Sequence, residues 1–360
     1  MNYRIVLYLW LVLFLYSGCL NAQVYTDRKV HSYPFTEKTS VEVSNKYGKI
    51  HVITWDQDSV RFEVDLRISA SNMEKLEKLK NNVSIEFNDT KYFILAKTIF
   101  SNAGNVITDF VETYIPSNQV VINYMIYVPK QISLKIDNKF GDIYVDDFNG
   151  ALEINLSNGD LKANKITGST IINISSGDAT INNMNGGRVI ASYSDLVIKQ
   201  ASNIDMETKS SRITIAQADK LKIDSRRDKI KITSVEVLSS TGYFSTYEIE
   251  NLKKELRSTF KYGSLMIDNV EKDFSFININ SEYTDIDLFF DRNTSYNIDI
   301  AHHNDVFINL PASLAKVQTK DLDVEQKLKL TYGKIGNADE NSAKLKITAP
   351  KKCVINIIHK

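Results

Sequence analysis

Four aspartates recur at a nearly constant spacing and are the residues of this chain with the most promise for chemistry. They lie 17 or 18 residues apart, and the series continues with two basic residues: Asp142, Asp160, Asp178, Asp195, Arg212 and Lys229. If successive repeats stack as parallel strands, the four carboxylates form a column with a spacing of about 5 Å. A divalent cation such as calcium would relieve the repulsion between them. The alternative is a solvated acidic edge whose aspartates cap the turns through their own backbone amides, and we favour it.

Other residues that could do chemistry form weaker patterns. His302 and His303 precede Asp305 and could hold a transition metal, but neighbouring residues of a strand point to opposite faces. The close carboxylate pairs of the repeat region are Asp146 with Asp147 and Asp285 with Asp287. The sequence shows no Ser-His-Asp arrangement, P-loop or dinucleotide fingerprint. We therefore predict no catalytic, cofactor-binding or metal-binding residues.

A short phrase, repeated through the chain, must position all of these residues. It appears as NKYGKIHV at 45–52 and as NKFGDIYV at 138–145, and then returns every 17–18 residues in the middle of the chain. The residue at the turn is small or turn-prone, which we attribute to the dihedral angles that a reversal requires. The turn residues are Gly48, Gly141, Gly159, Gly177, Ser194, Ser211, Asp228, Ser245, Gly263, Thr284 and Asn304.

Apolar residues occupy fixed positions relative to each turn. The second and fourth residues after it are almost all Ile, Leu, Val or Ala, and another apolar residue follows at the seventh. A period of two with one apolar face is typical of a β-strand that buries that face. The outward strand positions mix Lys, Asp, Thr, Tyr and Asn without a large aromatic stripe, so they favour no class of ligand.

The chain divides into five segments by pattern. Residues 1–22 resemble a secretory signal peptide, and 23–40 form a polar lead-in. Residues 41–131 hold the first coil and an inserted cap, in which SNMEKLEKLKNN predicts a helix with Ser71 as its cap and Glu74 completing a capping box. Regular coils fill 132–310, and 311–360 are expected to be capping strands at the C-terminal end.

Two interpretations of the export signal remain open. The residues LNA before Gln23 suit an ordinary signal peptidase, whereas YSGC at 16–19 resembles a lipoprotein box that would lipidate Cys19. A membrane partner is expected only if Cys19 is lipidated. In either case Cys353 has no partner for an intrachain disulfide in the mature protein.

Charge argues against nucleic acid as a partner. The chain has 44 Lys and Arg residues and 44 Asp and Glu residues, so its formal net charge is zero. Nucleic-acid-binding proteins usually carry a basic patch. The short basic pairs Arg226-Arg227 and Lys253-Lys254 are interpreted as solvated surface.

The repeated phrase also carries a family resemblance. VEVSNKYGKIHVITWDQDSVRFEV, the helix segment and LKIDNKFGDIYVDDFNGALEINLSNGDL occur in the order found in bacterial secreted domains called "putative adhesins". The resemblance covers roughly residues 40–310 and implies a β-solenoid of unknown function, with no family catalytic residues to carry over. The coils between Ser194 and Ser245 depart from the family pattern because they lack the turn glycine.

These observations predict an all-β protein. We expect a parallel β-solenoid of 17–18 residues per coil, with a helix-containing N-terminal cap and C-terminal capping strands. The expected role is non-enzymatic binding or structure in the envelope or outside the cell, with an unknown protein or glycan as partner. A periplasmic sensor or regulator of envelope function is the second hypothesis. A carbohydrate-active β-helix enzyme is the third, although the short turns leave little material for a cleft.

Overall fold

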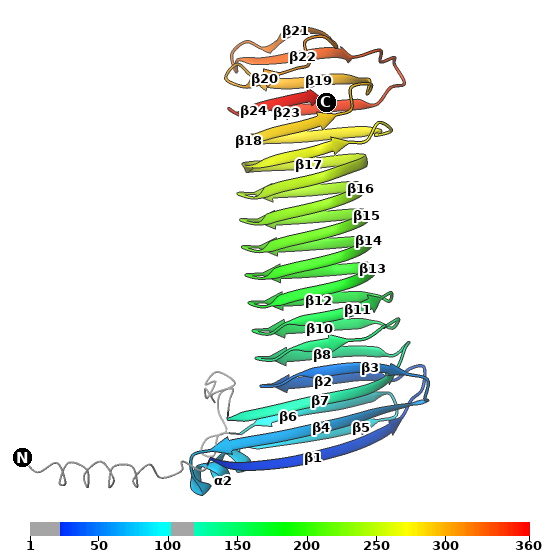
Figure 1. Cartoon of the computed structure of the whole chain (residues 1–360), viewed down its shortest axis with the longest axis vertical. Coiled ribbons are helices and arrows are strands. Elements are labelled where there is room, and N and C mark those ends of the chain that lie inside the picture. Colours follow the sequence, from blue (N-terminus) through cyan, green and yellow to red (C-terminus); the bar gives the residue numbers. More distant parts are fainter. Residues whose placement is uncertain (1–21, 102–118) are drawn as a thin grey trace, which may run out of the picture.

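β-strands are the main secondary structure in a computed structural model that describes residues 22–101 and 119–360. They form one 24-stranded sheet, and Figure 1 shows them stacked as a long ladder with the helix at one end. Most neighbouring strands are parallel, as the repeat predicts. The all-β prediction is therefore confirmed. Residues 1–21, which include Cys19 and nearly all of the expected signal peptide, lie outside the described residues.

The first regular repeats alternate two short strands. They are β8 (Ser133–Lys139), β9 (Ile143–Val145), β10 (Leu152–Ser157), β11 (Leu161–Ile166) and β12 (Thr170–Ser175). β8, β10 and β12 pair in parallel, with Ile154 between Ile136 and Ile172. Like residues thus stack on like residues at a spacing of 18 positions, and the apolar side chains fall into columns.

The next repeats are one residue shorter and form longer strands. β13 (Asp178–Ser192), β14 (Asp195–Lys209), β15 (Arg212–Arg226) and β16 (Lys229–Tyr243) each run for 15 residues and are separated by two-residue turns. β17 (Thr246–Val270) and β18 (Phe276–Phe290) continue the series. All pair in parallel with their neighbours.

The predicted apolar columns form the core. The residues two and four positions after the turns are buried, from Ile50 and Val52 through Ile213 and Ile215 to Leu288. The third column is buried from Phe148 to Val270, whereas Trp55 at its start is partly exposed. The register deduced from the sequence is therefore confirmed.

The turns differ from the prediction in which residue adopts the unusual backbone conformation. The residue before each predicted turn position from Gly48 to Thr284 has a positive φ, for example 56° at Phe140, 58° at Arg227 and 56° at Tyr262, whereas the residue before Asn304 does not. The glycine that follows serves a different purpose. A Cβ on Gly159 would lie 2.1 Å from the carbonyl oxygen of Gly141 in the preceding repeat. Glycine is required there by close backbone approach and not by its own dihedral angles.

Two strands that come after the first repeat in the sequence form a rung that closes the N-terminal end of the ladder. β2 (Ser40–Lys46) and β3 (Ile50–Trp55) form the first repeat and lie against β8 and β9. On their other side, β6 (Phe93–Phe100) pairs with β2 and β7 (Val120–Pro129) pairs with β3. Antiparallel strands then cover this rung: β4 (Ser59–Ala70) on β7, β5 (Val83–Thr90) on β6, and β1 (Gln23–Pro34) on β4. The segment expected only as a polar lead-in therefore contains the 12-residue strand β1.

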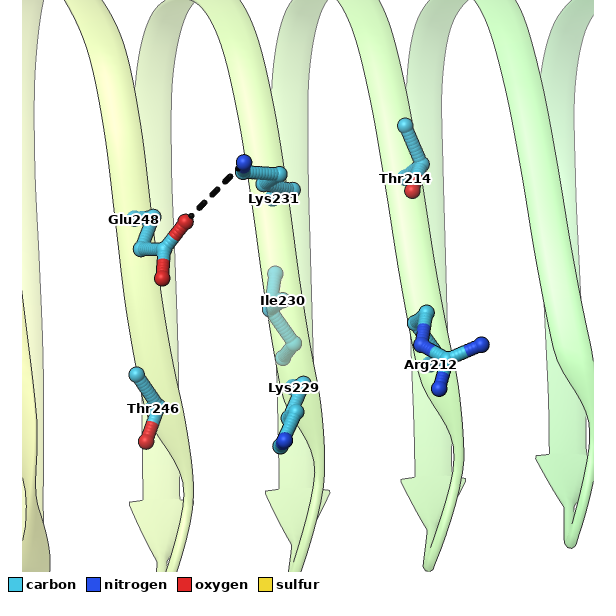
Figure 2. A pocket seen from close by; sticks show the side chains of 7 residues that line it. All are labelled: Arg212, Thr214, Lys229, Ile230, Lys231, Thr246 and Glu248. Carbon is cyan, nitrogen blue, oxygen red and sulfur yellow. Dashed lines mark ion pairs between the residues drawn. The ribbon is translucent and has the colours of Figure 1, made fainter.

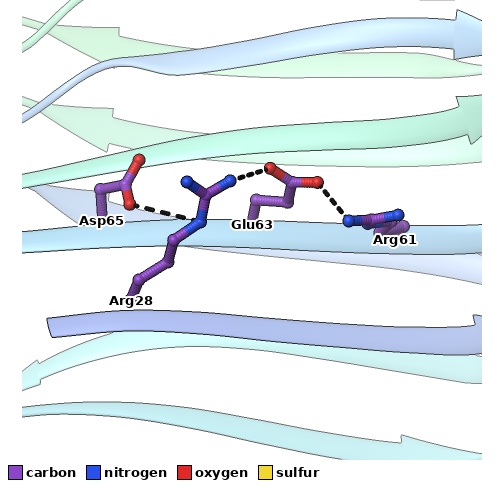
Figure 3. Close-up of polar contacts among 4 residues, drawn as sticks. All are labelled: Arg28, Arg61, Glu63 and Asp65. Carbon is purple, nitrogen blue, oxygen red and sulfur yellow. Dashed lines mark hydrogen bonds and ion pairs between the residues drawn. The ribbon is translucent and has the colours of Figure 1, made fainter.

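An ion-pair network joins β1 to β4 (Figure 3). The buried carboxylate of Glu63 lies 2.6 Å from Arg28 and 2.7 Å from Arg61, and Arg28 also lies 3.8 Å from Asp65. A buried carboxylate is tolerated when charged hydrogen bonds replace its water. Arg28 donates such a hydrogen bond to Glu63, and Arg61 adds an ion pair.

The predicted helix is present as α2 (Met73–Asn81), but its cap is one residue later than expected. The side chain of Asn72, not that of Ser71, accepts a hydrogen bond from the backbone N–H of Lys75 at 2.9 Å. Leu76 is buried against the cap strands, and Leu79 packs beside it. None of the described residues form a helix that is long and apolar enough to cross a membrane.

The C-terminal end uses the last residues of the chain as an internal rung. β23 (Lys344–Ala349) and β24 (Val354–His359) pair with β18 on one side, and with β19 (Tyr296–His303) and β20 (Phe307–Asn309) on the other. β22 (Leu328–Ile335) runs antiparallel to β19, and β21 (Ala315–Asp323) lies outermost. Among the described residues, β21 and β22 are the strands that lie beyond β19 at this end. Cys353 is buried in the inserted rung as a free thiol, and burial raises its pKa to about 11.

Candidate functional site

The acidic column predicted from the sequence forms one edge of the ladder. Asp178 and Asp195 are direct neighbours in the parallel register, and Arg212 follows Asp195. An oxygen of Asp142 accepts a hydrogen bond from the backbone N–H of Asp160 at 3.1 Å, and Asp160 accepts one from Asp178 at 3.2 Å. The carboxylates thus cap backbone amides of the next repeat, whereas their own amides were expected. Among the described residues, no three His, Cys, Asp or Glu side chains are grouped so as to hold a metal ion.

The column changes sign in the middle of the ladder, and a shallow hollow lies at that place. It has a volume of about 460 Å³ and is lined by Arg212, Thr214, Lys229, Ile230, Lys231, Thr246 and Glu248. Figure 2 shows Arg212, Lys229 and Thr246 at matching heights on three neighbouring strands, with Lys231 turned toward Glu248. Arg212 pairs with Asp195 at 2.5 Å and Lys231 pairs with Glu248 at 3.2 Å.

Two successive turns concentrate positive charge beside this hollow. The cations are exposed and form what we call the basic turn edge: Lys209, Arg212, Arg226, Arg227 and Lys229. Their register is direct, because Lys209 pairs with Arg226 and Arg212 pairs with Lys229. Within 22–101 and 119–360, only Arg212 of this set makes an ion pair. The pair Arg226-Arg227, which the sequence alone suggested to be ordinary solvated surface, is therefore part of a cluster assembled by stacking.

A buried carboxylate lies directly beneath this cluster. Asp228 is 2% exposed, and it accepts hydrogen bonds from the hydroxyl of Thr208 at 2.7 Å and from the backbone N–H groups of Ser211 and Arg226 at 2.7 and 2.8 Å. Burial raises its pKa, while these three donors oppose the rise. Asp228 holds two turns together, so the basic side chains above it have a fixed backbone.

Exposed aromatic rings continue the same edge and were missed by the sequence analysis. The aromatic edge consists of Tyr243, Phe244, Tyr262 and Tyr283, which are 37% to 49% exposed. Phe244 and Tyr262 stack at 4.9 Å between ring centres, and Tyr262 and Tyr283 stack at 5.2 Å. The rings lie at the corners of successive repeats, where Phe244, Tyr262 and Tyr283 have a positive φ, and not along the strand faces where an aromatic stripe was sought. The recurring aromatic residue before the turn in NKYG and NKFG was the signal that could have revealed them.

A second hollow lies on the other side of the basic turn edge. It has a volume of about 740 Å³, and its lining includes Ser192, Lys209, Asp224, Arg226, Thr241 and Tyr243. The guanidinium of Arg226 lies 5.7 Å from the ring centre of Tyr243, which is within cation–π range. Cations, hydroxyls, carboxylates and an aromatic ring thus surround one shallow surface. Such a surface can bind a polar ligand by charge, hydrogen bonds and ring contacts.

The remaining candidate residues are dispersed. His302 is buried and lies 3.0 Å from the hydroxyl of Thr331, whereas His303 is partly exposed and lies 3.5 Å from Asp305. Burial lowers the pKa of His302. The two rings lie on opposite sides of β19, as strand alternation predicts.

The close carboxylate pairs are engaged in hydrogen bonds that link repeats. Asp147 accepts from Asn164 at 2.6 Å. Asp285 accepts from the backbone N–H of Val354 at 2.8 Å, and Asp287 accepts from Asn356 at 2.7 Å. Asp146 lies 3.4 Å from His51. Each carboxylate therefore has its own partner in another repeat.

Comparison with known proteins gives matches among solved structures. No model of a known protein family matches the sequence, and no curated protein matches it. A "putative adhesin" from Parabacteroides merdae is 11% identical, with a TM-score of 0.35 and coverage of 74% of this chain and 94% of that one. A "putative adhesin" from Bacteroides fragilis is 10% identical, with a TM-score of 0.27 and coverage of 93% and 97%. A "putative lipid binding protein" from Parabacteroides distasonis is 11% identical, with a TM-score of 0.36 and coverage of 72% and 96%. The sequence resemblance to "putative adhesins" is thus matched by solved structures of that name.

Proposed function

We propose that this chain is a parallel β-solenoid that acts outside the cell or in the envelope as a non-enzymatic, adhesin-like binding protein. The solenoid is supported by in-register parallel pairing of residues 17 and 18 positions apart through the middle repeats. In this proposal the ladder is a rigid support, and its turn edge is the part that contacts a partner.

The observation that carries the binding role is the aromatic edge. Phe244 is 49% exposed and Tyr283 is 46% exposed, although the core has room for rings such as Tyr247 and Phe260. Soluble proteins seldom expose contiguous aromatic side chains, and such patches often mark interaction sites. Tyrosine is also enriched where proteins bind partners, because its ring is apolar and its hydroxyl forms hydrogen bonds.

A retention assay on isolated cell envelopes tests this function. The purified protein should bind envelopes saturably, and replacement of Phe244 and Tyr262 by serine should reduce the affinity at least about tenfold. The matched control is Tyr92→Ser, because Tyr92 is 47% exposed in the turn between β5 and β6 of the N-terminal cap, away from the aromatic edge. Saturable binding that is equally strong in the double variant would refute the role of this edge, and no saturable binding to any envelope would refute the function.

A further inference from the structure

The basic turn edge lies between two polar hollows, and this combination indicates a class of ligand. Five cations project from two successive turns, KSSR at 209–212 and RRDK at 226–229, whose only carboxylate is the buried Asp228. The hollow on one side is lined by Arg212, Lys229 and Lys231, and the hollow on the other by Lys209 and Arg226. An anionic ligand that crosses the turn would meet cations on both sides.

We propose that this surface binds an acidic polysaccharide, a chain of sugars that carries carboxylate or sulfate groups. The inference rests on the proposed binding function and names the ligand class of that site. Arg226 and Arg227 would pair with the anionic groups, because a guanidinium presents parallel donors to a carboxylate or sulfate. Lys229 would add positive charge at the rim of the hollow in Figure 2.

The linings of the hollows favour a ligand rich in hydroxyl groups. Thr214, Thr246 and Glu248 lie in one hollow, and Ser192, Thr241 and Asp224 lie in the other. Hydroxyl and carboxylate side chains both accept hydrogen bonds from sugar hydroxyls. The ring of Tyr243 at the second hollow offers an apolar surface to the C–H groups of a sugar.

Two other polyanions fit this surface less well. Single-stranded nucleic acid binds by stacking its bases on open aromatic faces, but Phe244, Tyr262 and Tyr283 cover one another's faces at interplanar angles of 13° and 5°. An anionic membrane is flat and cannot enter the hollows, so its headgroups would reach only the cations at the rims. A sugar chain with spaced charges avoids both conflicts.

The test compares ligands and charge-reversal variants. Chondroitin sulfate, which carries carboxylates and sulfates, should bind the purified full-length protein more tightly than neutral dextran does, and the affinity should fall as salt rises. Arg227→Glu combined with Lys229→Glu should weaken chondroitin sulfate binding at least about tenfold. Lys220→Glu combined with Lys222→Glu changes the same net charge on exposed residues of β15 outside both hollows, and should leave the affinity unchanged.

Several results would overturn the proposal. Equal affinity for dextran, or chondroitin sulfate binding that survives the Arg227 and Lys229 reversal, would exclude this site for acidic sugars. Tighter binding to phosphatidylglycerol vesicles or to poly(dT), lost in the same variant, would assign the surface to a membrane or to nucleic acid. If the protein still binds isolated envelopes in any of these cases, the adhesin-like function stands and only the ligand class is refuted.

Discussion

The turn glycines provide the sharpest test of how the repeats are packed. A Cβ added to Gly159 would lie 2.1 Å from the carbonyl oxygen of Gly141, whereas ordinary contacts of a Cβ are 3.4–4 Å. The clash is more than 1 Å deep, and it meets backbone atoms that cannot rotate away. Overpacking in a well-packed interior costs about 1–3 kcal/mol. Because two hydrogen-bonded repeats must move apart, we expect Gly159→Ala to lower the free energy of unfolding by about 3 kcal/mol.

Gly186 supplies the matched control for this substitution. Its added Cβ would meet only the carbonyl oxygen of Asn203, at an ordinary distance of 3.4 Å. Gly186→Ala should therefore be neutral or slightly stabilising, since alanine restricts the unfolded chain. Urea unfolding followed by circular dichroism gives the midpoint for each variant. A Gly159→Ala midpoint equal to that of Gly186→Ala would show that close approach does not dictate the turn glycines.

Four further predictions follow from buried or bonded groups. Ile215→Asp should lower the free energy of unfolding by several kcal/mol, because Ile215 is fully buried, whereas Thr214→Asp on the outer face should lower it far less. Equal losses of stability for the two variants in urea unfolding would contradict the register. Glu63→Ala should cost about 1–2 kcal/mol, since it removes the carboxylate shared by Arg28 and Arg61, whose side chains are partly exposed. Glu77→Ala in the exposed pair with Lys80 should cost less than about 0.5 kcal/mol. The pKa of Asp228 is raised in the fold, so its contribution to stability is greatest below the ordinary carboxyl pKa and declines as the pH rises to the raised value. Over this pH range the melting temperature of the wild type should fall relative to that of Asp228→Asn. Melting temperatures that change in parallel would refute a raised pKa at Asp228. Millimolar calcium should leave the melting temperature unchanged, because Asp142 and Asp160 already bind backbone amides. If calcium raises the melting temperature by many degrees, and if the double variant Asp160→Asn, Asp178→Asn loses this rise, the metal-site hypothesis is restored.

The core residues could be predicted from the sequence because apolar residues recur at fixed positions in each repeat. Ile213 and Ile215 alternate with polar residues, and a one-residue slip would expose both, so the register has only one solution. The reason for glycine at the turns could not be predicted from the sequence. Both a positive φ and a close approach select glycine, and only coordinates place the positive φ at Phe140 and the approach at Gly141.

The order of rungs at the two ends and the basic turn edge could not be deduced in the same way. Pairing partners are not encoded in the alternation of a strand, so nothing in residues 344–359 indicates that they insert between β18 and β19. A basic pair such as Arg226-Arg227 is common on protein surfaces. It becomes part of a basic cluster only because strand pairing places Lys209 next to Arg226 and Lys229 next to Arg212. The aromatic residue before several turns was visible in the sequence, but its exposure was not: Tyr47 and Tyr262 both have a positive φ, yet Tyr47 is buried and Tyr262 is exposed.

The insertion of β23 and β24 between β18 and the β19–β20 rung has a consequence for how the molecule is completed during synthesis. The repeats from β8 to β18 can form in the order in which they leave the ribosome, since each lies on the one before it. β19 cannot settle on β18, because the position between them belongs to residues 344–359. The far end must therefore wait for residues 344–359. Loss of those residues would leave a gap inside the ladder with the end strands β19–β22 detached, a more severe defect than fraying of a terminus.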